Sequence, residues 1–195
     1  MDKTIYLASR SPRRAEILNQ LGIKFEILPA DVDESPLQNE SPEEYVMRLA
    51  RFKAQTCSRY LNAHPKSALP ILAADTTVAI DGLVLGKPED AWDAFAMIKR
   101  MSGRWHDVHT GVALAAESDI HVVLSSTRVL FDDLDESTIN AYLATGEYKD
   151  KAGAYGIQGM ASSFIRSIHG SYSGVMGLPI FETTKLLALV GIRVL

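Results

Sequence analysis

Apolar and polar positions follow two different periods along the chain, and each change of period marks a new element. Runs of apolar residues predict buried strands, and apolar residues three and four apart predict one face of a helix. Strands are expected at Thr4–Ala8, Lys24–Leu28, Ile71–Ile80, Trp105–Ala116, Ile120–Phe131 and Phe164–Ile168. Helices are expected from Pro12 to Gly22, Ser41 to Leu61, Glu89 to Met101, Asp135 to Gly146 and Pro179 to Val190.

Local signals at the element ends support this assignment. Ser11 is a good N-cap, Pro12 suits the first helical position, and Gly22 suits the C-terminal stop. Asp81-Gly82 directly follows an apolar run and is a strong hairpin signal.

Helices and strands alternate at both ends of the chain, and a β-meander occupies the middle. This order predicts an α/β protein with a mixed, elongated and bent sheet, flanking helices and two lobes around a cleft. The spacing does not fit a regular doubly wound sheet. We expect residues 1–195 to form a single domain.

Composition narrows the class of protein. Hydrophobic residues make up 47% of the 195 residues, and no apolar run reaches the about 18 residues needed to span a bilayer. Neither a signal peptide nor a membrane partner is expected, and the single cysteine, Cys57, excludes an internal disulfide and a cysteine-based zinc site. A cytoplasmic location is therefore expected.

The net charge is −4, although basic residues cluster locally. A protein that wraps nucleic acid usually carries a basic surplus. The balance favours a small anionic ligand in a pocket, and nucleic acid is not expected as a partner.

The segment SRSPRR, Ser9 to Arg14, lies where a strand passes into a helix. A helix N-terminus attracts anions, and Ser9, Arg13 and Arg14 add hydroxyl and guanidinium donors. A capped helix with solvated arginines is the alternative. Two arginines in a first turn oppose the helix dipole, which favours a phosphate-bearing ligand.

Asp75 interrupts the apolar strand ILAADTTVAI. A buried carboxylate without a partner is costly, so Asp75 needs a cation, a metal ion or a solvated strand edge. It therefore suits a metal ligand or a general base that activates water, with a solvated edge as the alternative.

Three further charged residues gain meaning only if the anion pocket exists. Lys53 lies on the apolar stripe of the second helix, and Lys87 precedes the third helix. Snorkelling and plain exposure would also explain them. Glu34 follows Asp33 in a polar loop, where it is either solvated or supplies oxygen to a divalent cation.

The segment DKAGAYGIQG, Asp150 to Gly159, places three glycines at a spacing of three around Gln158. Glycine allows close backbone approach to a ligand, and a glutamine amide both donates and accepts. The segment is neither a P-loop nor a dinucleotide-binding fingerprint.

Six segments in order resemble the Maf family of nucleotide pyrophosphatases. They are LASxSPRR (Leu7–Arg14), RLAxxKA (Arg48–Ala54), ADT (Ala74–Thr76), GKP (Gly86–Pro88), DKAGAYGIQG (Asp150–Gly159) and GSYxxVxGLP (Gly170–Pro179). The resemblance implies the two-lobed fold shared with inosine-triphosphate pyrophosphatases, and it spans nearly the whole chain.

The resemblance also implies an activity. Family members cleave nucleoside triphosphates to a monophosphate and pyrophosphate with a divalent metal cation, Mg²⁺ or Mn²⁺, and the family hints at a homodimer. Asp75 corresponds to the proton acceptor, while Arg13, Thr76 and Gln158 correspond to residues linked to substrate choice. The wording of DKAGAYGIQG resembles the branch acting on dTTP and UTP, with modified pyrimidine nucleotides as further candidates.

The site expected from these residues holds a metal ion on Asp75 and Glu34, with Arg13, Arg14, Lys53 and Lys87 around the phosphates. Whether Asp75 is base or ligand stays open here. A non-catalytic nucleotide-binding regulator of cell division and a 7-methyl-GTP pyrophosphatase are the alternatives.

Overall fold

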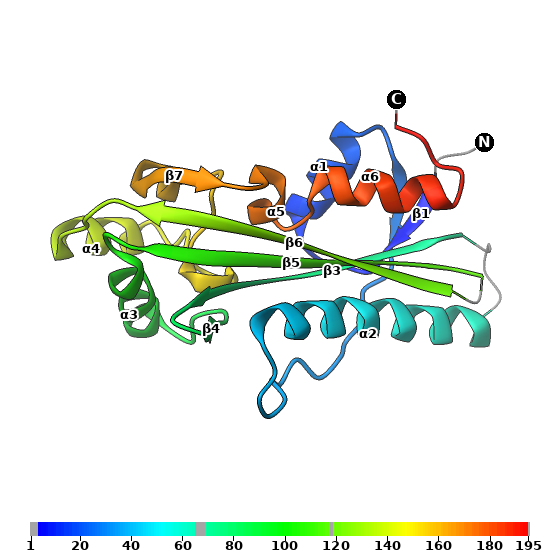
Figure 1. Ribbon diagram of the computed structural model, residues 1–195, viewed down its shortest axis with the longest axis horizontal. Helices are drawn as coiled ribbons and strands as arrows, with labels where there is room; N and C mark the ends of the chain where they lie inside the picture. Colours follow the sequence, from blue (N-terminus) through cyan, green and yellow to red (C-terminus); the bar gives the residue numbers. More distant parts are fainter. Residues whose placement is uncertain (1–3, 65–68, 118, 195) are drawn as a thin grey trace.

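One seven-stranded sheet forms the frame of the molecule. The computed structural model describes residues 4–64, 69–117 and 119–194 (Figure 1). The strand order is β2-β1-β3-β5-β6-β7, with β4 paired to β3. The strands are β1 Thr4–Leu7, β2 Lys24–Ile27, β3 Ile71–Ile80, β4 Leu83–Leu85, β5 Trp105–Ala116, β6 Asp119–Phe131 and β7 Ile165–His169.

The sheet is mixed, as the sequence predicted. β1 pairs in parallel with both β2 and β3, because helices connect these strands. β3, β5, β6 and β7 pair antiparallel in that order, and a direct hairpin joins β5 to β6. β3, β5 and β6 run along most of the molecule's length (Figure 1).

Helices cover both faces of one half of the sheet. The α-helices are α1 Pro12–Gln20, α2 Pro42–Ala63, α3 Ala91–Met101, α4 Glu136–Ala144, α5 Tyr172–Met176 and α6 Ile180–Leu189, of which α1 and α6 cover one face of this half and α2 the other. Alternate residues of β3 face opposite ways. Leu72 and Ala74 pack in the cluster that contains α1 and α6, whereas Ile71 and Ala73 pack against α2.

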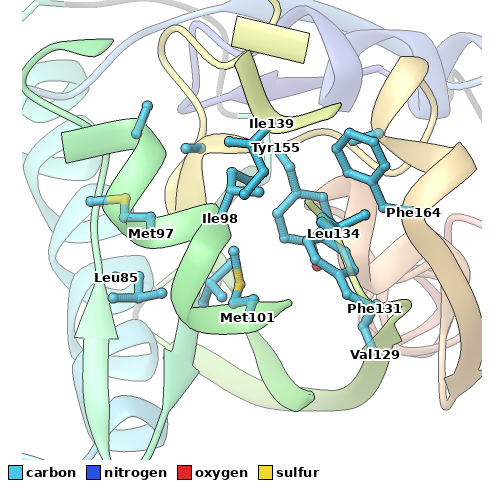
Figure 2. Packing of buried hydrophobic residues seen from close by; sticks show 14 of the residues in the cluster. Leu85, Met97, Ile98, Met101, Val129, Phe131, Leu134, Ile139, Tyr155 and Phe164 are labelled. Carbon is cyan, nitrogen blue, oxygen red and sulfur yellow. The ribbon is translucent and has the colours of Figure 1, made fainter. Parts of the chain in front are cut away.

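A separate core fills the other half, around α3 and α4 (Figure 2). Phe131, Phe164 and Tyr155 meet edge to face at its centre. β3 enters this core at Val78, so Asp75 to Thr77 lie between the two halves. These are the two lobes that the sequence predicted.

Differences from the predicted elements are small and have local causes. α3 begins at Ala91, because the Asp90 side chain accepts a hydrogen bond from the Asp93 N–H and caps the helix. Phe164 ends the short 3₁₀ helix Met160–Phe164, so β7 starts one residue later than expected. The sequence did not predict α5, because its turn is rich in glycine and serine.

None of the helices in the described part of the chain is both long and apolar enough to cross a membrane. That residues 1–195 form a single domain stays a prediction.

Gly111 brings α2 close to the centre of the sheet. It pairs with Asp75 across the β3–β5 ladder. A Cβ at Gly111 would lie 2.5 Å from the carbonyl oxygen of Val46 and 2.7 Å from its carbonyl carbon. Both atoms are backbone of α2, so a larger residue would push the helix away.

We expect Gly111→Ala to lower the free energy of unfolding by about 1–3 kcal/mol, because the added methyl overpacks against helix backbone. Urea unfolding measures the loss. Gly86→Ala is the matched control, since its Cβ would meet nothing within 4 Å. Equal stability of the two variants would contradict this account of the packing.

Candidate active site

A cavity of about 900 Å³ lies between the lobes. It is bounded by the start of α1, the loop after β2, the middle of β3 and the loop before β7. Its acidic lining residues are Asp31, Glu34, Asp75 and Asp150; its basic ones are Arg10, Arg13, Arg14, Lys53, Lys87, Lys149 and Lys151. The cavity is thus locally basic within an acidic protein, which suits a polyanion.

Ser9 lies at the turn from β1 into α1. Its Oγ accepts from the Ser11 N–H at 3.2 Å and from Arg14 Nη1 at 3.0 Å. Ser9 is buried and lines the cavity. With both acceptor positions taken, its own hydroxyl proton remains for a ligand. Ser11 occupies the N-cap position as predicted, but its side chain makes no capping hydrogen bond.

Arg14 is held by the protein itself. Besides Ser9, its Nε donates to the Gly177 carbonyl at 2.7 Å, and Nη2 donates to Thr76 Oγ1 at 3.1 Å. Burial lowers the pKa of Arg14, and the nearby Asp75 carboxylate opposes that change. Arg14 therefore ties α1, β3 and the turn after α5 together.

The hydroxyls of Thr76 and Thr110 continue this network. Their oxygens are 2.9 Å apart, and Thr110 donates to the Gly174 carbonyl at 2.8 Å. Because Arg14 can only donate and a carbonyl can only accept, the direction is fixed. Thr76 accepts from Arg14 and donates to Thr110, so its proton is already committed.

Asp75 and Lys53 form a buried ion pair at the floor of the cavity. Lys53 Nζ lies 2.6 Å from Asp75 Oδ1 and 2.6 Å from Glu34 Oε1. The exposed fractions of the side chains are 12% for Lys53, 11% for Asp75 and 48% for Glu34. The position of Lys53 on the apolar stripe of α2 thus reflects a charged partner on β3.

Burial raises the pKa of Asp75 above its usual range, although Lys53 and Arg14 act in the opposite direction. Ion pairing offsets only part of the desolvation. A carboxylate with a raised pKa is a better proton acceptor, which suits general base catalysis.

Two carboxylates converge on one position, that of the Lys53 ammonium. Within residues 4–64, 69–117 and 119–194, no group of three or more metal-binding side chains occurs. Mg²⁺ needs only one or two protein carboxylates when phosphates and water supply the other oxygens. The pair Asp75 and Glu34 therefore fits a divalent cation whose other oxygen ligands come from outside the protein.

Arg13 and Lys87 have no such partners. Neither side chain forms a hydrogen bond or ion pair with another described residue, yet both line the cavity. Burial lowers the pKa of Arg13, and Lys87 is exposed. With Lys149, whose ammonium also has no such partner among the described residues, they are the cations most available to a ligand.

The glycine-rich loop packs tightly beside β3. A Cβ at Gly153 would lie within 3.0 Å of all three carbon atoms of the Val78 side chain. The next residue, Ala154, has a φ of 62°, and its carbonyl accepts from Tyr142 Oη at 3.1 Å. This loop carries Gln158, whose Nε2 donates to Glu16 Oε2 at 3.3 Å.

The sequence interpretation missed Lys149 and Lys151 as cavity residues. Their position on either side of Asp150, directly before the glycines, was the available signal. Lys151 Nζ donates to the Glu147 carbonyl, and burial and the nearby Arg13 lower its pKa.

Comparison with known proteins shows the family of this chain. The family model for Maf-like protein matches residues 4–190. The chain belongs to the Maf-like protein family. A dTTP/UTP pyrophosphatase of Methylobacillus flagellatus is 56% identical over 97% of this chain and 94% of the relative.

A dTTP/UTP pyrophosphatase of Nitrosomonas europaea is 50% identical, over 97% of this chain and 96% of the relative. Among solved structures, a dITP/XTP pyrophosphatase of Mycobacterium abscessus aligns with 96% of this chain and 93% of its own, at 17% identity and a TM-score of 0.42.

We expect Asp75→Asn to gain stability relative to the native chain as pH rises. The pKa of an aspartate in the unfolded chain is about 3.9, whereas the pKa of Asp75 is raised in the folded protein. The native chain therefore loses stability from about that pH up to the folded pKa, and the amide does not.

Urea unfolding in chelator between pH 4 and 8 measures this difference. A difference that is constant across that range, or that shrinks as pH rises, would contradict a raised pKa. The assay needs no substrate, so it is independent of catalysis.

We expect Arg14→Met to lower the free energy of unfolding by about 2 kcal/mol or more, because it removes charge-assisted hydrogen bonds to three partners. Arg13→Met is the control on the same helix, and we expect little loss from it. Thermal and urea unfolding compare the two. Similar losses would show that Arg14 is no more structural than its neighbour.

Proposed function

We propose that this protein is a nucleoside triphosphate pyrophosphatase that hydrolyses dTTP and UTP to the monophosphate and pyrophosphate. The observation that carries the proposal is a buried carboxylate, Asp75, at the floor of a cavity with seven basic side chains and four acidic ones. The names of the two relatives above, at 56% and 50% identity, support the reaction and the pyrimidine substrates.

The phosphate groups are proposed to lie against the cations without protein partners. Arg13 and Lys87 supply charge, and the Ser9 hydroxyl donates a hydrogen bond. Positive groups fixed in advance stabilise the charge that develops on phosphoryl oxygens. Arg14 and Lys53 are proposed to act mainly by holding the site together, since each directs several of its N–H donors to protein oxygens.

Asp75 is proposed to take a proton from the attacking water. Oδ1 faces Lys53, on the side where the cation described below would lie, which leaves Oδ2 for the water. The water oxygen bonds to the α-phosphorus, and the bond from that phosphorus to the α–β bridging oxygen breaks. Pyrophosphate leaves with the bridging oxygen, and the proton stays on Asp75 until solvent removes it.

Asp75 and Glu34 would hold the divalent cation, Mg²⁺ or Mn²⁺, because their carboxylates converge. When bound, the cation withdraws charge from the phosphate oxygens. The protein keeps the two carboxylates close together, and Lys53 bridges them when no cation is bound.

The pyrimidine is proposed to lie near Gln158, which lines the cavity and is exposed. Its amide can donate and accept to a base edge. Thr76 is less suited to contact the base directly, because its hydroxyl donates to Thr110. We propose that Thr76 influences substrate choice through its contact with Arg14 and through the shape of the site.

The remaining expectations extend this proposal. We expect the enzyme to act in the cytoplasm, to form a homodimer and to leave nucleic acid unbound. The acidic net charge supports the last point, and seven of the 20 Lys and Arg residues line this one cavity.

The test is pyrophosphate release from dTTP, UTP, dATP, GTP and 7-methyl-GTP with Mg²⁺ or Mn²⁺. We expect dTTP and UTP to be cleaved fastest, and Asp75→Asn to lower kcat at least about a hundredfold. Gln158→Glu is the specificity variant; its kcat/KM should fall more for UTP than for GTP.

Each alternative predicts a different result. Saturable dTTP binding without pyrophosphate release would indicate a non-catalytic nucleotide-binding regulator of cell division. Preferred cleavage of 7-methyl-GTP would indicate the other enzyme branch. Near-native turnover of Asp75→Asn would remove Asp75 from the chemistry.

A further inference from the structure

Glu34 reaches the buried pair from a loop without regular structure. The loop runs from the end of β2 to the start of α2, and residues 28–41 contain no helix or strand. An exposed carboxylate on such a loop gains little from one ion pair. Its place beside Lys53 must therefore depend on other contacts within the loop.

The carboxylate of Glu40 organises the second half of this loop. Oε2 accepts from the Leu37 N–H at 3.0 Å and from Arg48 Nη2 at 2.7 Å, while Oε1 accepts from Arg48 Nε. The exposed fractions of the two side chains are 7% for Glu40 and 15% for Arg48. A two-pronged, largely buried pair of this kind fixes both position and orientation.

Arg48 also holds the first half of the loop. Its Nη2 donates to the Ser35 carbonyl at 3.1 Å, and its guanidinium lies 5.6 Å from the centre of the Tyr45 ring. Tyr45 Oη in turn donates to the Glu34 carbonyl at 2.9 Å. Burial, with Asp75 and Glu34 nearby, raises the pKa of Tyr45 to about 12, so the phenol remains a donor.

We propose that Arg48 is a positioning residue which, with Glu40 and Tyr45, holds Glu34 against Lys53 and Asp75. Arg48 does not contact Lys53 or Asp75 itself. It contacts the loop, and the loop places the Glu34 carboxylate beside Lys53. This inference rests on the proposed function, because it assigns Glu34 a part in that same site.

Removal of the guanidinium has a specific structural cost. Glu40 would keep the Leu37 N–H but lose its cation while largely buried, and the Ser35 carbonyl would lose its donor. The loop would then sample other positions, and Glu34 would spend less time beside Lys53. Small displacements of a site group reduce turnover by one or two powers of ten.

A double-mutant cycle tests whether Arg48 acts through Glu34. Pyrophosphate release is measured for the native chain, Arg48→Gln, Glu34→Gln and the double variant, with dTTP and excess Mg²⁺. We expect Arg48→Gln to lower kcat about tenfold in the native background and less than twofold in the Glu34→Gln background. A similar loss in both backgrounds, or no loss in the first, would overturn the proposal.

Arg51→Gln is the matched control, because Arg51 is exposed on the same helix three residues further along. We expect native turnover from it. Arg48→Lys should recover only part of the activity, since an ammonium cannot reproduce the two-pronged pair. Full recovery by lysine would contradict the geometric role.

Hydrogen exchange provides a readout independent of catalysis. We expect faster exchange at residues 33–40 in Arg48→Gln than in the native chain or Arg51→Gln, with the strands unchanged. Unchanged exchange in this loop would refute the positioning role of Arg48 even if turnover fell. If the native chain releases no pyrophosphate but Arg48→Gln still exchanges faster in this loop, the positioning role is retained and the proposed function is rejected.

Discussion

The site depends on a carboxylate placed in the interior of a long strand. Asp75 is largely buried where β3 passes from one lobe to the other, and water solvates its charge only in part there. Cations from outside the strand must approach it: Lys53 from α2, and Arg14 from α1. Gly111, opposite Asp75 in the ladder, permits the close approach of α2 that brings Lys53 within reach.

The four basic residues that the sequence predicted for this site therefore divide into two groups with different roles. Lys53 and Arg14 are engaged with protein oxygens and maintain the floor of the site. Arg13 and Lys87 keep their donors for a ligand. The adjacent residues Arg13 and Arg14 thus have different roles, because only the Arg14 side chain hydrogen-bonds to protein oxygens. Cations without partners would repel one another, whereas in this site the carboxylates of Asp75 and Glu34 offset part of that repulsion.

Local patterns predicted most of the elements, and distant partners account for what they could not predict. β3 has the predicted bounds, because ten mostly apolar residues end at the Asp81-Gly82 turn. The capping box at Ser41 likewise fixes the start of α2. Nothing in the local pattern could show that Lys53 meets a residue 22 positions away. The unequal roles of Arg13 and Arg14 also depend on Gly177, far along the chain. The family motifs indicated which residues gather, but not which of them contact one another.

The continuity of the central strands limits how the cleft can move. β3 pairs with β5 without a break from Ile71 to Ala79, and β5 pairs with β6 from Trp105 to Ala116. Both lobes share these strands, so a hinge between them would have to bend an intact hydrogen-bonded ladder. We therefore expect adaptation to a ligand to occur mainly in the connecting loops, while the continuous sheet sets the spacing between Asp75 and the glycine-rich loop.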